Sequence, residues 1–263
     1  MNLELITKQV VELSREVGDF IRQERKNFDH ERVEQKNGFN DLVSYVDKEA
    51  EEKFVNALRK IVPEAGFIAE EGTAEPAQEY NWVIDPIDGT TNFLHNLPIY
   101  STSVALIKKK QLLSGVVYEI NADECFHAHQ EGDAYLNENV IKVSAIKNLK
   151  EGLLATGFPY HGELQMDKFM DMFQYFMANS HGVRRLGSAA ADLVYVACGR
   201  LEGFYEFNLN PWDIAAGALI VRQAGGEVTD FSGTDNFLFS GEIFASNQHI
   251  HVETLKVLKQ MWT

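Results

Sequence analysis

The sequence predicts a layered α/β fold, in which helices pack against sheets around a shared core. Two observations lead to this prediction. Segments with apolar residues every three or four positions alternate with short apolar strands, and no repeat or linker separates independent units. The composition agrees, because 45% of the 263 residues are hydrophobic and 24% are charged, as in ordinary globular proteins. A chain of this length can bury a large core without a metal or a disulfide.

The first half of the chain begins with helices and continues with strands. Amphipathic spacing predicts a helix over residues 3–25, whereas the polar residues 27–41 predict a mobile loop. Residues 42–46 alternate like a strand, Asp47 stands at the N-cap position of a second helix, and Pro63 stops that helix. Further strands, several of them divided by Lys-rich or Asn/Asp turns, are expected at residues 66–69, 82–84, 100–107, 112–119 and 124–129.

The second half alternates strands and helices more regularly. A stripe of Met and Phe between Met166 and Met177 predicts a helix that packs into the core. The other expected elements are strands at residues 152–156, near 183, at 201–206 and at 243–246, and helices at 188–197, 211–222 and 250–261. A shift in composition near residues 140–150 marks a seam, so we expect one domain, 1–263, with subdomains of about 1–145 and 146–263.

Charge and targeting features limit the classes of function. The 24 Lys and Arg against 39 Asp and Glu give a net charge of −15, which is unfavourable for binding a phosphate backbone, so we expect no nucleic-acid partner. Two distant cysteines, Cys125 and Cys198, do not make a disulfide framework and favour a cytoplasmic protein. The amphipathic N-terminus does not resemble a signal peptide, and without a long apolar run we expect no membrane partner.

The most informative segment is WVIDPIDGTTNF at residues 82–93. An apolar strand delivers the carboxylates of Asp85 and Asp88, and Pro86 restricts Asp85 to an extended backbone. Gly89 lets the main chain approach a ligand closely, and the N–H groups that follow suit a phosphate. Oxygen ligands for Mg²⁺ therefore stand beside an anion site, as chemistry at a phosphate monoester requires. The alternative is an Asp-rich turn that caps a helix.

Further acidic residues occupy the same kind of position. Glu70 and Glu71 follow a short strand, and Asp47 and Asp213 stand at helix starts. Singly, each is also typical of a solvated strand end or a capped helix. Together they are expected to meet in one crevice, where carboxylates repel each other unless divalent cations lie between them. Because no His or Cys stands nearby, the ligands favour Mg²⁺ over Zn²⁺ or copper.

Several motifs occur in a fixed order along the chain. DPIDGTTNF spans residues 85–93, with Glu70-Glu71 before it, and WDIAAG spans residues 212–217, with GSAA at 187–190 before it and QAGG at 223–226 after it. In this order they resemble the inositol monophosphatase family of Mg²⁺-dependent, lithium-sensitive phosphatases over almost the whole chain. The resemblance implies an alternating α-β-α-β-α sandwich of the inositol monophosphatase and fructose-1,6-bisphosphatase type.

The resemblance also implies roles for individual residues. Metal ligands for two to three Mg²⁺ ions per subunit would be Glu70, Asp85, the carbonyl of Ile87, Asp88 and Asp213. Catalytic residues would be Glu70 and Thr90, which orient a metal-bound water, and Asp47, which supports Thr90. Substrate contacts would be Glu70, Ile87, Asp88, Gly89, Thr90, Gly187, Ser188, Ala189, Glu206 and Asp213. Lys36 matches a family lysine in a mobile loop near the metals.

The resemblance implies hydrolysis of inositol monophosphate to inositol and phosphate. Two metals would polarise the phosphate, generate hydroxide and stabilise the leaving alkoxide, without a phosphoenzyme. A broader phosphatase acting on NADP(H), fructose 1,6-bisphosphate or other sugar phosphates is the alternative, because relatives share the metal and phosphate residues. A different class of function is that of a binding partner of the transcription machinery. As partners we expect a small phosphorylated substrate and, as is common in the family, a second copy in a homodimer.

Overall fold

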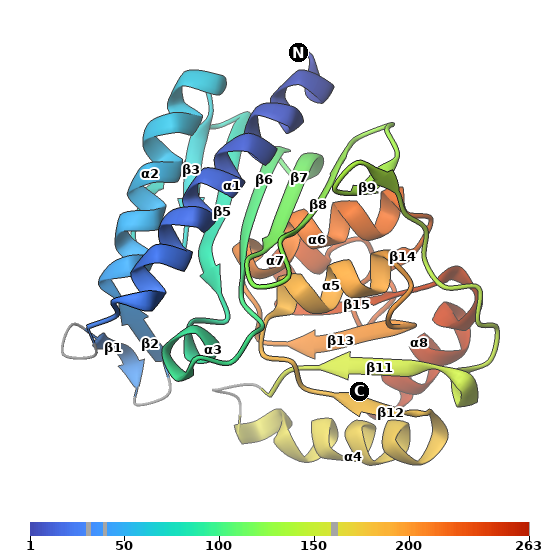
Figure 1. Ribbon diagram of the computed structural model, residues 1–263. Helices are drawn as coiled ribbons and strands as arrows, with labels where there is room; N and C mark the ends of the chain where they lie inside the picture. The colour runs from blue at the N-terminus through green and yellow to red at the C-terminus, as the bar shows by residue number, and fades with distance from the viewer. Residues whose placement is uncertain (30–32, 39–40, 159–162, 263) are drawn as a thin grey trace.

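The computed structural model describes residues 1–29, 33–38, 41–158 and 163–262 (Figure 1). Its outermost layer is a pair of helices, α1 (Leu3–Lys26) and α2 (Tyr45–Ile61), which pack against each other and against the first sheet. The N-terminal helix ends one residue later than predicted. Its buried face repeats every three or four residues, as an amphipathic helix requires.

The segment between these helices corrects two predictions. Part of the predicted loop forms a hairpin of β1 (Val33–Gly38) and β2 (Asp41–Ser44), so Lys36 lies in a strand. The N-cap of α2 is Ser44, whose hydroxyl accepts from Val46 N at 3.2 Å, and Asp47 is the third helical residue. Asp47 returns the bond by accepting from Ser44 N at 2.9 Å. This reciprocal capping box satisfies two of the unpaired donors at the helix start, which leaves Asp47 facing inward.

The second layer is a sheet of eight strands. They are β3 (Gly66–Ala69), β4 (Ala74–Glu75), β5 (Tyr80–Asp88), β6 (Ser101–Lys108), β7 (Gln111–Glu119), β8 (Glu124–His129), β9 (Ala134–Leu136) and β10 (Asn139–Val140). Their spatial order is β10-β9-β8-β7-β6-β5-β3-β4, antiparallel except where β3 runs parallel to β5. A short helix, α3 (Thr90–His95), follows β5 directly.

This sheet is buried on both faces, which explains why its strands are almost continuously apolar. In β6, Val104 and Leu106 pack toward α1 and α2, whereas Ala105 and Ile107 pack on the opposite face. Because strand side chains alternate with a period of two, one apolar run supplies two separate cores. Each fully buried aliphatic side chain contributes roughly 1.5–3 kcal/mol to folding.

Two helices form the middle layer, between the two sheets (Figure 1). They are α5 (Ala189–Ala197) and α6 (Pro211–Gln223), which pack on each other and on the first sheet. Both are built mainly from small and aliphatic residues that are fully buried. A helix that is apolar all round must be covered on every side, and the central position provides that cover.

The last two layers complete the sandwich. A sheet of five strands has the order β12-β11-β13-β15-β14. Its strands are β11 (Leu153–Thr156), β12 (Gly182–Arg184), β13 (Gly203–Phe207), β14 (Glu227–Thr229) and β15 (Glu242–Ser246). Outside it lie α4 (Glu163–Asn179) and α8 (Gln248–Trp262), with the short η2 (Leu149–Glu151) and α7 (Phe237–Ser240) at its margins. The predicted α-β-α-β-α order is therefore confirmed.

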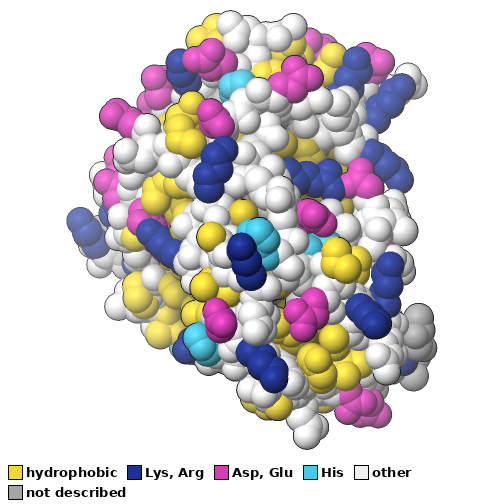
Figure 2. All heavy atoms as spheres, turned by 90° about the vertical axis from the view of Figure 1, so that its right-hand side faces the viewer, with side chains coloured by type: hydrophobic (Ala, Val, Ile, Leu, Met, Phe, Trp, Pro, Cys, Tyr) yellow, Lys and Arg dark blue, Asp and Glu magenta, His cyan; other side chains and the backbone are white. Residues whose placement is uncertain are grey.

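The surface carries both signs of charge. On the face in Figure 2, Lys and Arg side chains are interspersed with Asp and Glu. Residues 141–152, which include η2, connect the first sheet to the second. Within the described residues, every helix is too short or too polar to span a membrane.

Candidate active site

A cavity of about 830 Å³ lies between the end of β5 and the starts of α5 and α6. Its acidic lining residues are Glu70, Asp85, Asp88, Asp192, Glu206, Asp213 and Glu242. Also in its wall are the predicted substrate contacts Ile87, Gly89, Thr90, Gly187, Ser188 and Ala189. The fold thus gathers into one cavity every residue predicted as a metal ligand or a substrate contact. The side chain of Lys36 lies outside the described part of the structure, so its predicted position near the metals stays a prediction.

Asp85 and Asp88 lie in the last part of strand β5, which ends at Asp88. Pairing of β5 with β6 is interrupted by a register shift between Asp85 and Asp88, where Pro86 has no N–H to donate. After this bulge, Ile87 N donates to Asp85 Oδ1 at 3.0 Å. Asp85 is 1% exposed and Asp88 9% exposed, so both carboxyls are held in a nearly dry position at the strand end.

The start of α5 holds Asp88 in place. Its Oδ2 accepts from Ser188 Oγ and from Ala190 N, both at 2.6 Å. Two donors fixed on a helix start are a strong orienting pair, since hydrogen bonds to a carboxylate are shorter and stronger than neutral ones. This contact also joins the two halves of the chain at the cavity.

Thr90 is bound in a similar way from the other side. Its hydroxyl lies 3.0 Å from Asp47 Oδ1 and 3.0 Å from the carbonyl oxygen of Ile87. Asp47 is fully buried, and its Oδ2 accepts from the Ser44 hydroxyl at 2.6 Å. A hydroxyl has only one proton, so this proton is committed to Asp47 or Ile87. The Thr90 oxygen can then accept a hydrogen bond from a group in the cavity.

Gly89 makes the sharp turn from β5 into α3. Its φ of +97° lies in the left-handed region, which costs little only for glycine. A Cβ there would come within 3.0 Å of the carbonyl oxygen of Gly187 and 3.1 Å of that of Ile99. Gly89 therefore allows the two halves to approach closely at the cavity wall.

Glu51 positions the loop that carries Glu70. Its carboxylate, 3% exposed on α2, accepts from Glu71 N at 2.6 Å and from Thr73 N at 3.0 Å. Sequence reasoning missed Glu51, because a glutamate inside a helix usually faces solvent. The signal was its spacing of four from Asp47, which places both on one helix face.

Asp213 completes the acidic wall from α6. It is the third residue of this helix, and its Oδ2 accepts from Asn210 N at 2.7 Å in a second capping box. Pro211 opens the helix, where a missing N–H has no cost. The capping box therefore uses Oδ2 of Asp213, and the rest of this carboxylate faces the cavity.

Burial and mutual repulsion raise the pKa values of these acids. Burial and then Glu70 raise the pKa of Asp85 and of Asp213 well above the ordinary value of an aspartate. Burial raises the pKa of Asp88 to about 6 and that of Asp47 also to about 6. The cluster is therefore costly to ionise alone, and a nearby cation would reverse these shifts.

The acids suit a divalent cation in chemistry and in electrostatics. Among the described residues, no three His, Cys, Asp or Glu side chains stand close enough together to hold an ion as placed. Instead, the negative charge of Glu70 adds to burial in raising the pKa of Asp85. A cation at this position would meet several oxygen ligands, the type that Mg²⁺ prefers.

Two further cavity residues were not predicted. Arg185 is an exposed cation at the cavity edge, beside the ring of Phe158 at 5.9 Å. Asp192 lies one turn into α5 and is 1% exposed. In the sequence, Asp192 is indistinguishable from an ordinary acid in the first turn of a helix.

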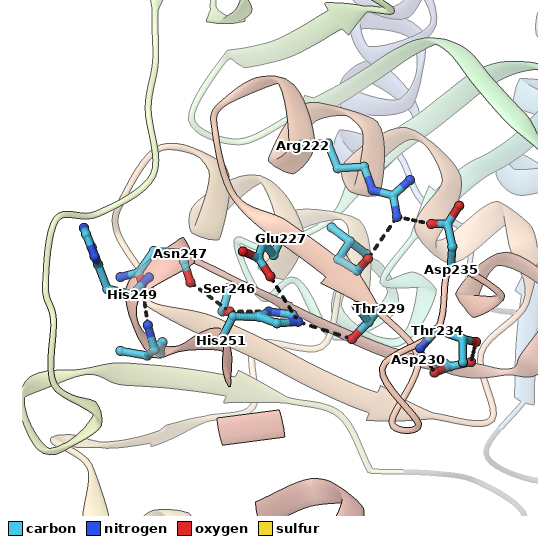
Figure 3. A network of polar contacts seen from close by, with 12 residues as sticks. Arg222, Glu227, Thr229, Asp230, Thr234, Asp235, Ser246, Asn247, His249 and His251 are labelled. Atoms are coloured by element: carbon cyan, nitrogen blue, oxygen red, sulfur yellow. Dashed lines mark hydrogen bonds and ion pairs between the residues drawn. The ribbon is translucent and has the colours of Figure 1, made fainter. Parts of the chain in front are cut away.

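A separate polar network lies between β14, β15 and the start of α8 (Figure 3). His251, 2% exposed, contacts Ser246 Oγ through Nδ1 at 2.8 Å and Thr229 Oγ1 through Nε2 at 3.3 Å. Its ring stacks on Phe244 at 4.6 Å between centroids. Because none of these residues lines the cavity, we interpret this network as structural.

Comparison with known proteins agrees with this geometry. The model of the inositol monophosphatase family matches residues 2–263. The chain belongs to the inositol monophosphatase family. Members of the family are phosphatases and generally depend on metal ions, and the acidic cavity agrees with both properties.

Individual relatives carry two kinds of name. The chain is 40% identical over 225 residues to an inositol-1-monophosphatase of Mesorhizobium japonicum, covering 85% of each chain. It is 42% identical over 243 residues to the Nus factor SuhB of Pseudomonas aeruginosa, covering 89% of this chain and 88% of that protein. The solved extragenic suppressor protein suhB of Bartonella henselae superposes with a TM-score of 0.91 at 35% identity, covering 97% of this chain and 99% of that one.

One of our predictions about partners is wrong. Net charge led us to expect no nucleic-acid partner, yet similar members of the inositol monophosphatase family are named Nus factors, which implies association with the transcription machinery. A net charge of −15 describes the whole surface and says nothing about a local protein contact within a larger assembly.

Proposed function

We propose that this chain is a Mg²⁺-dependent phosphomonoesterase that hydrolyses inositol monophosphate to inositol and phosphate. The observation that carries the proposal is the acidic cavity itself, where the five predicted metal ligands meet beside a Thr90 hydroxyl directed by Asp47. Without a cation these carboxyls are costly to ionise together, because burial and the neighbouring acids raise the pKa of Asp85. With cations the cavity has the ligands of a metal-assisted hydrolase.

The proposed ligands are Glu70, Asp85, the Ile87 carbonyl, Asp88 and Asp213. When bound, the Mg²⁺ ions would supply charge to polarise the phosphate and to acidify a water molecule. The protein supplies orientation, because Asp88 is fixed by Ser188 and Ala190 before substrate arrives. Preorganised donors and ligands avoid the cost of rearranging polar groups during the reaction.

Thr90 and Glu70 would position the attacking water. The Thr90 proton is committed to Asp47 or to the Ile87 carbonyl, so its oxygen is free to accept a hydrogen bond from the water. Glu70 lies in the cavity wall on a loop held by Glu51. The backbone N–H groups at Gly89 and Thr90 would bind the phosphate, and Glu206 would accept from hydroxyls of the alcohol.

The substrate is tested by Mg²⁺-dependent phosphate release from inositol 1-phosphate, NADP and fructose 1,6-bisphosphate at matched concentrations. We expect the highest kcat/KM with inositol 1-phosphate and inhibition by millimolar Li⁺. A higher kcat/KM with NADP or fructose 1,6-bisphosphate would keep the metal-assisted hydrolysis and replace the substrate. No release from any of the three would contradict the proposal.

A second function is favoured by the relatives named Nus factor SuhB. We propose that this chain also associates with the transcription machinery. The test is co-purification of RNA polymerase with the tagged chain from its own cells, for the wild type and the Asp85→Asn variant. Equal recovery with both would show an association that does not need the acidic cavity, whereas no recovery with either would contradict it.

A further inference from the structure

Asp192 lies in the cavity wall without a role in the proposed hydrolysis. Its side chain is 1% exposed, and its Oδ1 has no hydrogen-bond partner among the described residues. A buried acceptor without a partner is rare and costs free energy. The chain tolerates this cost at a position that faces the cavity, where a bound molecule could provide the missing donor.

The backbone around Asp192 places it beside the substrate end of the cavity. Asp192 stands four residues after Ser188, so both lie on the same face of the start of α5. Ser188 Oγ is committed to Asp88. Asp192 therefore lies one helical turn after Ser188, next to the predicted metal ligands. We place the alcohol of the substrate at this end of the cavity.

Two charged neighbours share this end of the cavity. Glu206 on β13 packs against Gly157, where an added Cβ would come within 1.9 Å of Glu206 Oε1. Burial, then Glu206 and Asp88, raise the pKa of Asp192, and Arg185 lowers it. Asp192 and Glu206 thus form a pair of acceptors with one cation at the edge.

We propose that Asp192 is a specificity-determining residue that accepts a hydrogen bond from a hydroxyl of the leaving alcohol, next to the hydroxyl bound by Glu206. The proposal rests on the proposed phosphatase function and adds to it a second carboxyl that contacts the alcohol. Two neighbouring carboxyls offer several acceptor oxygens to hydroxyl donors. The matching alcohol therefore carries adjacent free hydroxyls, one for each carboxyl.

The first experiment compares two substrates in the wild type, Asp192→Ala and Asp192→Asn. Inositol 1-phosphate offers hydroxyls, whereas 4-nitrophenyl phosphate has none. We expect Asp192→Ala to lower kcat/KM for inositol 1-phosphate at least about 10-fold, as loss of a buried hydrogen bond to substrate does, and to change that for 4-nitrophenyl phosphate less than about 3-fold. Asp192→Asn keeps one acceptor oxygen, so its kcat/KM for inositol 1-phosphate should lie between those of the wild type and Asp192→Ala.

The second measurement is the melting temperature without substrate. An acid kept for function at a cost in stability should leave the Tm unchanged, or raised by a few degrees, when it becomes Ala. An acid kept for structure should lower the Tm when it becomes Ala. Asp171→Asn on the exposed face of α4 serves as a control that should change neither activity nor Tm.

The kcat/KM values and the Tm together decide whether Asp192 has this role. Selective loss with inositol 1-phosphate and a Tm that does not fall support the proposal. Equal loss with both substrates, no loss with either, or a lowered Tm overturns it.

Binding of myo-inositol in the presence of Mg²⁺ and phosphate, followed as a rise in Tm, separates this proposal from the phosphatase proposal. If the wild type releases no phosphate but Asp192→Ala abolishes the rise, the phosphatase function fails and the role of Asp192 stands. If Asp192→Ala retains the rise, the role of Asp192 fails.

Discussion

At the scale of single residues, two acids, one in the cavity wall and one behind it, are held by hydrogen bonds before any ligand binds. Asp47 receives two bonds from Ser44 and one from Thr90. Asp88 receives two bonds from the start of α5. These partners fix the orientation of both carboxyls, and they explain why short polar residues such as Ser44 and Ser188 occupy buried positions.

Thr90 is the residue whose loss should separate orientation from binding. Thr90→Ala removes the hydroxyl between Asp47 and Ile87, and we expect kcat to fall by about 100-fold, within the range for a group that assists proton transfer. Thr90→Ser keeps the hydroxyl and should stay within about 10-fold of the wild type. Steady-state kinetics with inositol 1-phosphate provides the comparison, and equal activity of all three proteins would refute this role.

Gly89 should be required for stability as well as activity. Gly89→Ala places a Cβ on a left-handed residue and against the Gly187 carbonyl. We expect a loss of about 1–3 kcal/mol in the free energy of unfolding. Urea denaturation provides the measurement, with Gly72→Ala as the control: Gly72 also has a positive φ, but its added Cβ meets nothing within 4 Å. Equal losses for the two variants would mean that the contact with Gly187 is unimportant.

At the scale of elements, helix α2 supports the cavity with two acids on one face. Asp47 directs Thr90, and four residues later Glu51 holds the backbone after β3. Helix α2 thus positions cavity residues through Asp47 and Glu51, which do not themselves line the cavity.

Loss of Glu51 should weaken metal binding and leave the fold intact. Glu51→Ala frees the N–H groups of Glu71 and Thr73, so Glu70 is less firmly placed. Loss of such supporting contacts typically costs 10–100-fold in metal affinity, and we expect the Mg²⁺ concentration for half-maximal activity to rise by about that factor. The exposed neighbour Glu52→Ala is the matched control, and a rise of equal size in this control would argue against the assignment.

The network around His251 should make stability depend on pH. Burial lowers the pKa of His251 to about 4, from an ordinary value of 6.5, although Glu227 Oε2 lies 3.8 Å from its Nε2. Between about pH 6.5 and pH 4, His251 therefore binds a proton in the unfolded chain but not in the folded chain. The stabilising contribution is present above pH 6.5 and decreases as the pH falls toward 4.

Replacing this histidine should remove that part of the pH dependence. We expect His251→Gln to lose less unfolding free energy than the wild type between pH 7 and pH 5, measured by urea denaturation. His95→Gln, at an exposed histidine, should keep the wild-type slope. If His251→Gln kept it as well, the imidazole would have to be protonated in the folded state.

At the scale of the whole molecule, the cavity forms where the two halves meet. Asn92 Nδ2 donates to the Ile99 carbonyl at 2.7 Å and to that of Leu186 at 2.8 Å. Asp88 crosses the same boundary to Ser188. A sandwich of alternating layers brings these segments together because α5 and α6 lie between the sheets.

Much of this arrangement could be predicted from the sequence. The layered fold follows from the alternation of elements, and the meeting of Asp85, Asp88 and Asp213 follows from their positions at strand ends and helix starts. Strand β2 was expected at residues 42–46, whereas β1 could not be predicted, because its residues VEQKNG include a single apolar side chain, Val33. Asp192 was missed for a different reason: only the tertiary structure distinguishes a buried acid from a solvated one.

The central claim is that the acidic cavity binds metal ions that drive phosphate release. Its most direct test is a Mg²⁺ titration of phosphate release from inositol 1-phosphate, with the wild type, Asp85→Asn and the exposed control Asp171→Asn. We predict no activity without Mg²⁺, wild-type behaviour of Asp171→Asn, and at least about a 100-fold lower kcat for Asp85→Asn, with unchanged circular dichroism. Activity without any divalent cation, or near-normal turnover by folded Asp85→Asn, would contradict the claim.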